Sequence, residues 1–412
     1  MIRKILLYSL AVVVFSLGAV SAAVVLAAVT QGTAPGAVFE RLSYRLLHTA
    51  GSLLPGIDTP FGRVEVRTKL VGDGLHIAAR CVHCRLEHPQ IAQSPLVSTT
   101  AQLDGILKGT RFRGEVRNEG VRVKLTATWQ DGKASGSFEL PPTPIADLYR
   151  AVASIVPEAD RAEIVGMISG TGTFQWPDFA VTFEPQVQDF RVDHLFDAWR
   201  YRHGLFDAQV RDETGKHIVK RFGEGAPNWI ALDQMGKYLP AAVVASEDFS
   251  FYSHPGYDIG SMLEATRANR EDKRRMRGGS TITQQLAKNL FLSGERTYAR
   301  KLRELLYAVH LEQSLGKKRI LELYLNIAEW GPDLHGASSA ARRYFGKEPA
   351  ALAPQEAAWL ASILRAPSHA WRKQYLQNRP RRWRVDLALK RMRNIGEQER
   401  QRAFEEPIVF AR

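Results

Sequence analysis

The sequence predicts a multidomain α+β protein with an N-terminal transmembrane helix, a β-rich accessory domain and a mostly helical domain. Three features support this: an uncharged run near the N-terminus, short alternating apolar and polar stretches in the middle, and helical patterns in the C-terminal half. At about 150 residues per domain, 412 residues suggest two or three domains. A hydrophobic fraction of 45% and a charged fraction of 24% exclude a largely disordered chain, a collagen-like fibre and a multi-span transporter.

The chain is strongly basic. Its formal net charge is +13 and its isoelectric point is about 9.8. Such an excess favours a polyanionic partner, which could be a nucleic acid, an anionic membrane surface or a phosphorylated substrate. Charge alone does not choose among these. Two cysteines are too few for a disulfide-rich scaffold.

Residues 5–29 carry no charge. As a helix they would extend roughly 37 Å, enough to cross a hydrocarbon core of ~30 Å with some tilt. Arg3 and Lys4 precede the run, so we expect a cytoplasmic N-terminus and export of the chain beyond residue 30. A cleaved signal peptide is the alternative, but its apolar core would be shorter, at ~7–15 residues. We therefore predict that residues 1–30 form a short stub and an uncleaved membrane anchor.

A β-rich accessory domain is predicted over residues 31–210. Residues 121–129 and 136–140 alternate apolar and polar side chains, which is typical of strands with one exposed face. Asp131-Gly132 between them indicates a hairpin. One helix is expected at about 144–156. We expect an antiparallel sheet or an open, barrel-like module, and no chemistry can be assigned to it.

Both cysteines lie in this region, as Cys81 and Cys84 with His83 between them and His88 nearby. The predicted export favours an oxidised pair that staples the end of a strand. Free thiols, or a metal or redox site, remain the alternatives.

Helical patterns begin after a composition change between residues 204 and 225, which defines a domain over 211–400 and a tail over 401–412. Within it, Glu247 and Asp248 end an apolar helical stretch, before aromatic residues, His254 and a Pro-Gly turn. Partial desolvation would raise the pKa of such a carboxylate and suit it to general acid or base work. The alternative is a solvated pair at a helix end.

The next segment begins with two glycines, and Ser280 or Thr281 then reads as a helix N-cap. Exposed amides and the helix dipole make an anion site plausible there, although an ordinary surface helix is the alternative. Six of the eleven residues at 267–277 are basic, including Arg277. They form either a flap beside a phosphate or a solvated loop. The helix after residue 281 is rich in polar side chains: Thr283, Gln284, Gln285, Lys288 and Asn289.

Two further helical segments carry candidate residues. In the first, Glu304 lies four residues after Arg300 and three after Lys301, so the three can meet on one helix face. The second is an amphipathic helix over 318–326. Taken alone, the ion pair could be surface decoration and the amphipathic helix a packing helix. The candidate polar residues of the amphipathic helix are Glu322, Tyr324 and Asn326.

Together, these four segments resemble the family-51 glycosyltransferases, the peptidoglycan polymerases that occur alone or within bifunctional penicillin-binding proteins. The second motif of that family, G-x-S-T-I-T-Q-Q-L-x-K-N, is matched without a break at 278–289. A fifth, looser motif is matched only approximately by Arg381 and Arg382. The other motifs are matched by Glu247, Asp248, Phe251, His254 and Gly256 (E-D-x-x-F-x-x-H-x-G), by Arg300, Lys301 and Glu304 (R-K-x-x-E), and by residues 320–326 (I-L-E-x-Y-L-N).

The resemblance implies a lysozyme-like glycosyltransferase domain that polymerises lipid II with inversion and release of undecaprenyl diphosphate. It assigns Glu247 as the general base on the acceptor 4-hydroxyl and Glu304 as the second catalytic carboxylate. It also implies a possible divalent metal, Mg or Mn, at the donor diphosphate. Lys288, Arg300 and Lys301, with Arg277 as a weaker candidate, would stabilise the departing diphosphate. The remaining implied substrate-binding residues are Asp248, His254, Ser280, Thr281, Gln284, Gln285, Asn289, Glu322, Tyr324 and Asn326.

No transpeptidase signature such as K-T-G occurs, so we expect a monofunctional enzyme. Its expected place is the cytoplasmic (inner) membrane, single-pass, with the catalytic domain on the periplasmic face. The expected partners are lipid II, the growing glycan strand, the membrane and other envelope proteins docked on the β-rich domain; nucleic acid is not expected. The alternatives are a non-catalytic envelope scaffold or lipid II-binding protein that works through the β domain, and a lytic enzyme on the same fold.

Overall fold

The computed structural model describes residues 57–59, 62–130, 133–177, 180–212, 214, 216–261, 264, 278–292, 294–295 and 297–411. They form two compact units. Unit 1 contains the described residues up to Leu195 and, from later in the chain, Glu295–Arg303; the remaining residues form unit 2. The predicted anchor (1–30) and Arg277 lie outside the described residues. Within those described, no helix is both long enough and apolar enough to span a bilayer.

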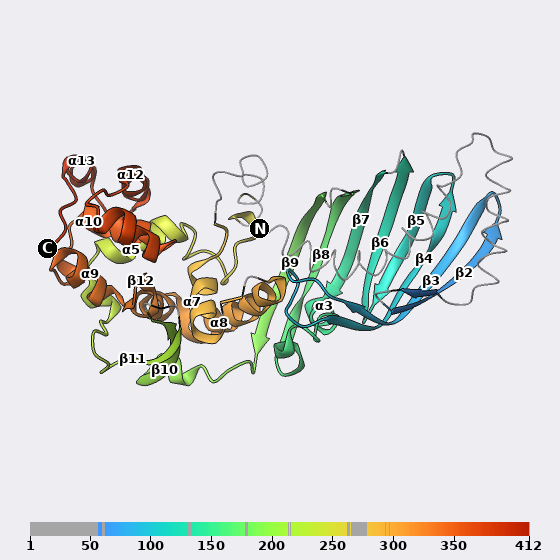
Figure 1. Cartoon of the computed structure of the whole chain (residues 1–412), viewed down its shortest axis with the longest axis horizontal. Helices are drawn as coiled ribbons and strands as arrows, with labels where there is room; N and C mark the ends of the chain where they lie inside the picture. The colour runs from blue at the N-terminus through green and yellow to red at the C-terminus, as the bar shows by residue number, and fades with distance from the viewer. Residues whose placement is uncertain are drawn as a thin grey trace. The chain divides into compact units, whose positions relative to one another are not determined.

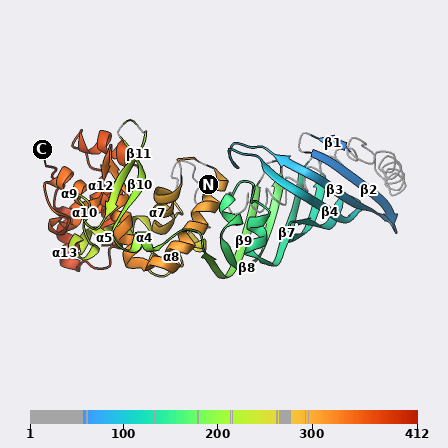
Figure 2. The same cartoon turned by 90° about the horizontal axis from the view of Figure 1, so that it is seen from below.

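Unit 1 is built on one nine-stranded antiparallel sheet whose strands are neighbours in chain order, as the ribbon in Figure 1 and the turned view in Figure 2 show. This confirms the predicted antiparallel sheet. The strands are β1 (Ile57–Thr59), β2 (Gly62–Val71), β3 (Gly74–Leu86), β4 (Leu96–Lys108), β5 (Arg111–Asn118), β6 (Val121–Gln130), β7 (Lys133–Pro144), β8 (Glu163–Trp176) and β9 (Ala180–Asp193).

The alternating sequence explains why the strands form. Val121, Val123 and Leu125 of β6 are buried, while the basic residues between them are exposed. Because successive side chains of a strand point to opposite faces, one face of the sheet is apolar and the other is wet. Gln130 pairs with Lys133, so β6 and β7 form the predicted hairpin, although its two turn residues lie outside the described part.

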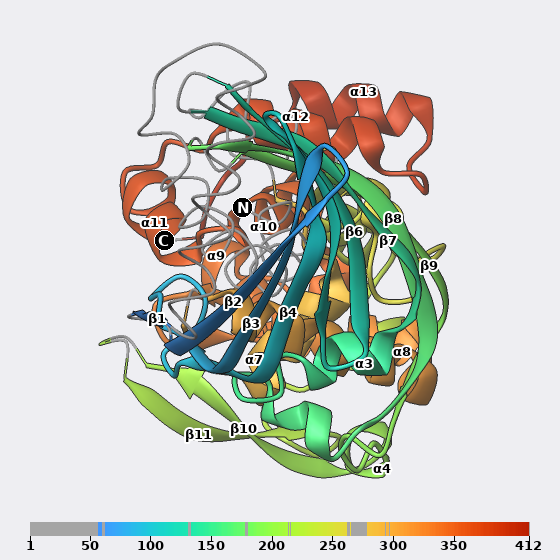
Figure 3. The ribbon, with the colours of Figure 1, turned by 90° about the vertical axis from the view of Figure 1, so that its right-hand side faces the viewer.

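Glycines on the apolar face let neighbouring strands approach closely. Gly105 and Gly114 are directly paired, and a Cβ atom on Gly114 would lie 2.7 Å from the Cα of Gly105. The ring of Phe112 occupies the space beside them. Glycines at such positions allow a sheet to bend, and the sheet of unit 1 is visibly curved in Figure 3.

Two short helices lie between β7 and β8: α3 (Ile145–Arg150) and the 3₁₀ helix η1 (Pro157–Asp160). The predicted helix at 144–156 is therefore present but shorter. On β3, Cys81 and Cys84 form the predicted disulfide, and both are buried with Val64 and Ala101.

Unit 2 is mostly helical and packs around α10 (Pro354–Ile363), which is buried on all sides from Gln355 onward. A helix that is buried all round must lie at the centre of its domain. Its neighbours include α5 (Tyr238–Glu247) and α12 (Arg382–Arg391). The other elements are α4 (Trp199–Arg202), β10 (Leu205–Arg211), β11 (His217–Gly223), η2 (Leu232–Met235), α7 (Ile282–Phe291), α8 (Tyr298–Ile327), β12 (Glu329–Gly331), β13 (Leu334–His335), α9 (Ala337–Phe345), η3 (Pro349–Ala351), α11 (Pro367–Ala370), η4 (Trp371–Tyr375) and α13 (Glu397–Glu405). Of α8, the residues up to Arg303 belong to unit 1.

The two expected domain limits fall inside elements of unit 2. The expected limit at 210/211 falls within the β10–β11 hairpin, which belongs to unit 2. The sequence predicts helices, not strands, at the start of this domain. Buried Phe206, Ala208 and Val210 recur at every second position, which is the pattern of a strand. The expected limit at 400/401 falls inside α13. The supposed tail packs as part of unit 2, and the N–H of Ala411 donates to the carbonyl of Tyr344 at 2.8 Å.

Candidate active site

Glu247 is the last residue of α5, a helix whose buried apolar side chains anchor it against the core of unit 2. The residue as a whole is partly exposed, yet burial of its carboxyl group raises the pKa of Glu247 above its ordinary value. A hydrogen bond from Gln285 and the charges of Arg365 and Arg384 act in the opposite direction. Glu247 thus lies at the end of an apolar helix, as expected, and its general acid or base role stays a prediction.

Gln285 of α7 and Tyr324 of α8 hold this carboxylate in place. The amide nitrogen of Gln285 donates to Oε2 of Glu247 at 2.9 Å, and the hydroxyl of Tyr324 donates to the amide oxygen of Gln285 at 3.0 Å. Burial raises the pKa of Tyr324 well above its ordinary value, so the hydroxyl stays protonated and remains a donor. Both ends of the amide are fixed, which orients Glu247.

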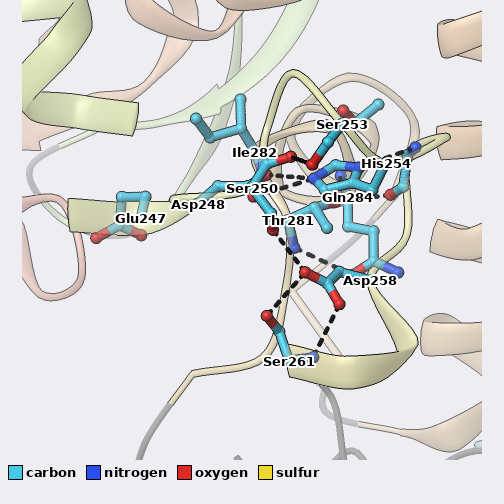
Figure 4. A network of polar contacts seen from close by, with 12 residues as sticks. Glu247, Asp248, Ser250, Ser253, His254, Asp258, Ser261, Thr281, Ile282 and Gln284 are labelled. Atoms are coloured by element: carbon cyan, nitrogen blue, oxygen red, sulfur yellow. Dashed lines mark hydrogen bonds and ion pairs between the residues drawn. The ribbon is translucent and has the colours of Figure 1, made fainter. Parts of the chain in front are cut away.

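Asp248 and His254 form a separate buried pair, shown in Figure 4. Nε2 of His254 lies 3.0 Å from both carboxylate oxygens of Asp248. The backbone N–H of Gly256 donates to Nδ1 of the same ring at 3.1 Å, so the ring proton lies on Nε2 and is donated to Asp248. Asp248 also accepts from the N–H of Ile282 at 2.9 Å, which places negative charge at the positive end of α7. In Figure 4 the carboxylate of Glu247 points away from this pair.

The N-terminus of α7 is capped by side chains of its own first turn. The hydroxyl of Thr281 accepts from the N–H of Gln284 at 3.1 Å, and the Gln284 side chain accepts from the N–H of Thr281 at 3.3 Å. This capping box satisfies two helix-start donors, and Thr281 also donates to the carbonyl of Gly256 at 2.7 Å. Thr281 is therefore the predicted N-cap. These polar groups bind the protein's own backbone, and their predicted role toward phosphates and sugars stays a prediction.

Glu322 and Asn326 of α8 hold the segment that leads into α5. Glu322 accepts from the N–H of Leu232 at 3.0 Å. Asn326 accepts from the N–H of Ile230 at 3.0 Å and donates to its carbonyl at 2.9 Å. These two candidate binding residues contact the protein's own backbone, and their role toward the substrate stays a prediction. Tyr324, between them in the sequence, lies at the Glu247 site through Gln285.

The remaining candidates are divided between the two units. Lys288 is exposed on α7, and Ser280 and Asn289 are partly exposed beside it. Arg300 and Lys301 belong to unit 1, while Glu304, which is buried, is the next residue of unit 2.

Sequence reasoning missed Arg365, after α10, and Arg384, in α12, whose charges favour the ionised form of Glu247. The basic run 381–384 could have pointed to Arg384, but nothing near Arg365 in the sequence could have done so. In the described part of the chain, no group of three or more His, Cys, Asp or Glu side chains is placed to hold a metal ion.

Comparison with known proteins identifies the family. A family model described as transglycosylase matches residues 215–393. A biosynthetic peptidoglycan transglycosylase from Alcanivorax borkumensis is 44% identical over 183 residues, which are 44% of this chain and 75% of that protein. One from Thiobacillus denitrificans is 41% identical over 211 residues, or 49% of this chain and 90% of that protein. The chain belongs to the transglycosylase family.

The family match leaves most of unit 1 outside it, because the matched residues begin after the nine-stranded sheet. The matched transglycosylase residues contain every candidate site residue from Glu247 to Asn326. The solved structure of penicillin-binding protein 1A from Haemophilus influenzae can be aligned with this protein. The alignment covers 50% of this chain and 21% of the penicillin-binding protein chain. The identity is 24% and the TM-score 0.27, which is too low to compare the folds.

Proposed function

We propose that Glu247 is the general base of glycan-chain polymerisation from lipid II. The chain is a peptidoglycan glycosyltransferase, in line with its family and relatives. The observation that carries the assignment of the base is the hydrogen-bonded series from Tyr324 through Gln285 to Glu247, which joins three motifs at one carboxylate. A carboxylate whose pKa is raised by burial is a better proton acceptor than a fully solvated one, so long as it is ionised.

The proposed reaction is a single displacement. Glu247 takes the proton from the 4-hydroxyl of the acceptor lipid II, and the oxygen attacks the anomeric carbon of the lipid-linked glycan donor. The bond from that carbon to the phosphate oxygen breaks, and undecaprenyl diphosphate leaves with the electron pair. Attack opposite the leaving group inverts the anomeric centre.

Negative charge develops on the diphosphate as it leaves, and cations placed beforehand stabilise it. We assign this role to Lys288, Arg300 and Lys301, with Glu304 as the second catalytic carboxylate. A divalent metal at the diphosphate is part of the proposal, and chelation followed by return of Mg²⁺ or Mn²⁺ tests it. The lysozyme-like arrangement of the helical unit belongs to the proposal as well.

The proposed location is the inner membrane, with residues 1–30 as the anchor and the catalytic unit on the periplasmic face. The net charge of +13 suits both a diphosphate substrate and an anionic bilayer. Docking of other envelope proteins on unit 1 is proposed as well.

The test is polymer formation from labelled lipid II in detergent by the intact protein. Loss of a general base costs ~10²–10⁴-fold in rate, so Glu247→Gln should reduce turnover by that amount. Glu348→Gln is the matched control, because Glu348 pairs with Arg342 at the surface of the same unit. A folded intact protein that makes no polymer, with or without divalent metal, would overturn the proposal. Retention of full activity by Glu247→Gln would overturn the assignment of the base.

A further inference from the structure

The helix that carries the third motif begins inside unit 1. Residues Glu295–Arg303 cluster with the nine-stranded sheet and not with the rest of the helical unit. They contain the first turns of α8 and two cationic side chains of the motif, Arg300 and Lys301. Glu304, the third residue of the motif, directly follows this segment and belongs to unit 2.

Backbone carbonyls of the sheet unit cap the start of α8. The first N–H groups of a helix have no partner within the helix. Here the N–H of Tyr298 donates to the carbonyl of Gln90 and the N–H of Ala299 to the carbonyl of Ile91, both at 2.9 Å. Gln90 and Ile91 lie in the loop between β3 and β4, and Ile91 is buried. The hydroxyl of Thr297 accepts from the N–H of Arg300 at 3.2 Å.

An ion pair between partly exposed Arg303 and a buried carboxylate holds the second turn of α8. Arg303 makes a two-pronged contact with Glu158 of η1, with Nε 2.8 Å from Oε2 and Nη2 2.8 Å from Oε1. The side chain of Glu158 is only 1% exposed. A buried carboxylate is costly unless it is paired, so this geometry strongly favours one position of Arg303. The hydroxyl of Tyr149 adds a bond to the carbonyl of Leu302 at 3.2 Å.

We propose that unit 1 positions the third motif for glycosyl transfer. The contacts at 298, 299, 302 and 303 are interleaved in the sequence with the motif residues 300, 301 and 304, so a shift of the helix start moves both sets together. Glu158 is a positioning residue, because it acts through Arg303 and touches no reacting atom. The inference rests on the proposed function and extends it to the part of the chain that the family match does not cover.

The test compares Glu158→Gln with Glu139→Gln in the full-length protein. Glu139, on β7 of the same unit, is a matched control because it is also paired with a basic side chain, that of Lys124 at 3.1 Å, but is half exposed. We expect Glu158→Gln to accelerate hydrogen exchange at the amides of Tyr298 and Ala299 and to leave β5 and β6 protected. Small displacements of catalytic groups can cost up to roughly 10²-fold, so kcat should fall by about tenfold or more, with KM changed far less.

A double variant distinguishes loss of the Arg303–Glu158 ion pair from a general loss of stability. Arg303→Gln alone removes the two-pronged partner of the buried Glu158 carboxylate, which keeps the longer contact with Arg161 at 3.8 Å, so adding Glu158→Gln should restore part of the lost turnover. If Glu158→Gln does not fold, Tyr149→Phe removes the bond to Leu302 with less disturbance, and Tyr344→Phe is its control.

Two results would overturn the inference. One is that Glu158→Gln behaves like Glu139→Gln in both exchange and turnover. The other is faster exchange at Tyr298 and Ala299 with unchanged kcat, which would make the contact structural only. If the wild-type protein makes no polymer, the proposed function fails separately. Unchanged hydrogen exchange at Tyr298 and Ala299 in Glu158→Gln would still refute the positioning of the start of α8 by Glu158.

Discussion

Replacing Gln285 with leucine would remove the donor that lies 2.9 Å from Oε2 of Glu247 while keeping a side chain of similar size. This hydrogen bond favours the ionised carboxylate and opposes the effect of burial on its pKa. Losing it should therefore raise the pKa of Glu247 further. Because the base must be ionised to accept a proton, activity should fall most at acid pH.

The size of the effect depends on the energy of the bond. A hydrogen bond to a charged group contributes about 1.5–3 kcal/mol. Since 1.36 kcal/mol corresponds to a factor of ten, kcat/KM on the acid side should fall roughly 10- to 160-fold. As pH rises through the new pKa, the variant's carboxylate ionises and kcat/KM should recover toward the wild-type value.

The assay is kcat/KM for labelled lipid II as a function of pH, which reports the free enzyme's essential base. Tyr324→Phe should move the acid limb in the same direction by less, because it only frees the amide of Gln285. Tyr344→Phe is the control: its hydroxyl is also buried and donates to the carbonyl of Trp330 at 2.7 Å, away from Glu247. A Gln285→Leu profile that drops equally at every pH, or keeps its acid limb in place, would refute the reasoning.

Two further predictions concern the buried residues of the first motif. Asp248→Asn removes the buried charge that accepts hydrogen bonds from the N–H of Ile282 and from His254. The free energy of unfolding should therefore fall by roughly 1.5–3 kcal/mol in denaturant titrations. The control Asp207→Asn, at the surface, should change it little. Gly256→Ala should lower both Tm and turnover, because φ is +92° and the new Cβ would lie 2.9 Å from the carbonyl oxygen of Ala308. The control Gly396→Ala has open space and should be neutral; equal effects at the two glycines would contradict the steric argument.

Much of the helical unit could be predicted from local sequence. The end of α5 at Glu247 and the N-cap at Thr281 each depend on residues within one helical turn, and the structure has both. The β6–β7 hairpin likewise depends on alternation and a two-residue turn. The β10–β11 hairpin has the same alternation, but the helical patterns that follow it favour a helical interpretation of this segment.

The sequence by itself determined the chemistry-bearing groups and their helical or strand setting, because periodicity and capping act over a few residues. Only the tertiary structure decided which groups meet: Gln285 reaches Glu247 across 38 residues, and Tyr324 reaches Gln285 across 39. It also decided that the first turns of α8 belong to unit 1, through Glu158 and Arg303, which are 145 residues apart. Such contacts depend on how the whole core packs, and no local preference specifies them.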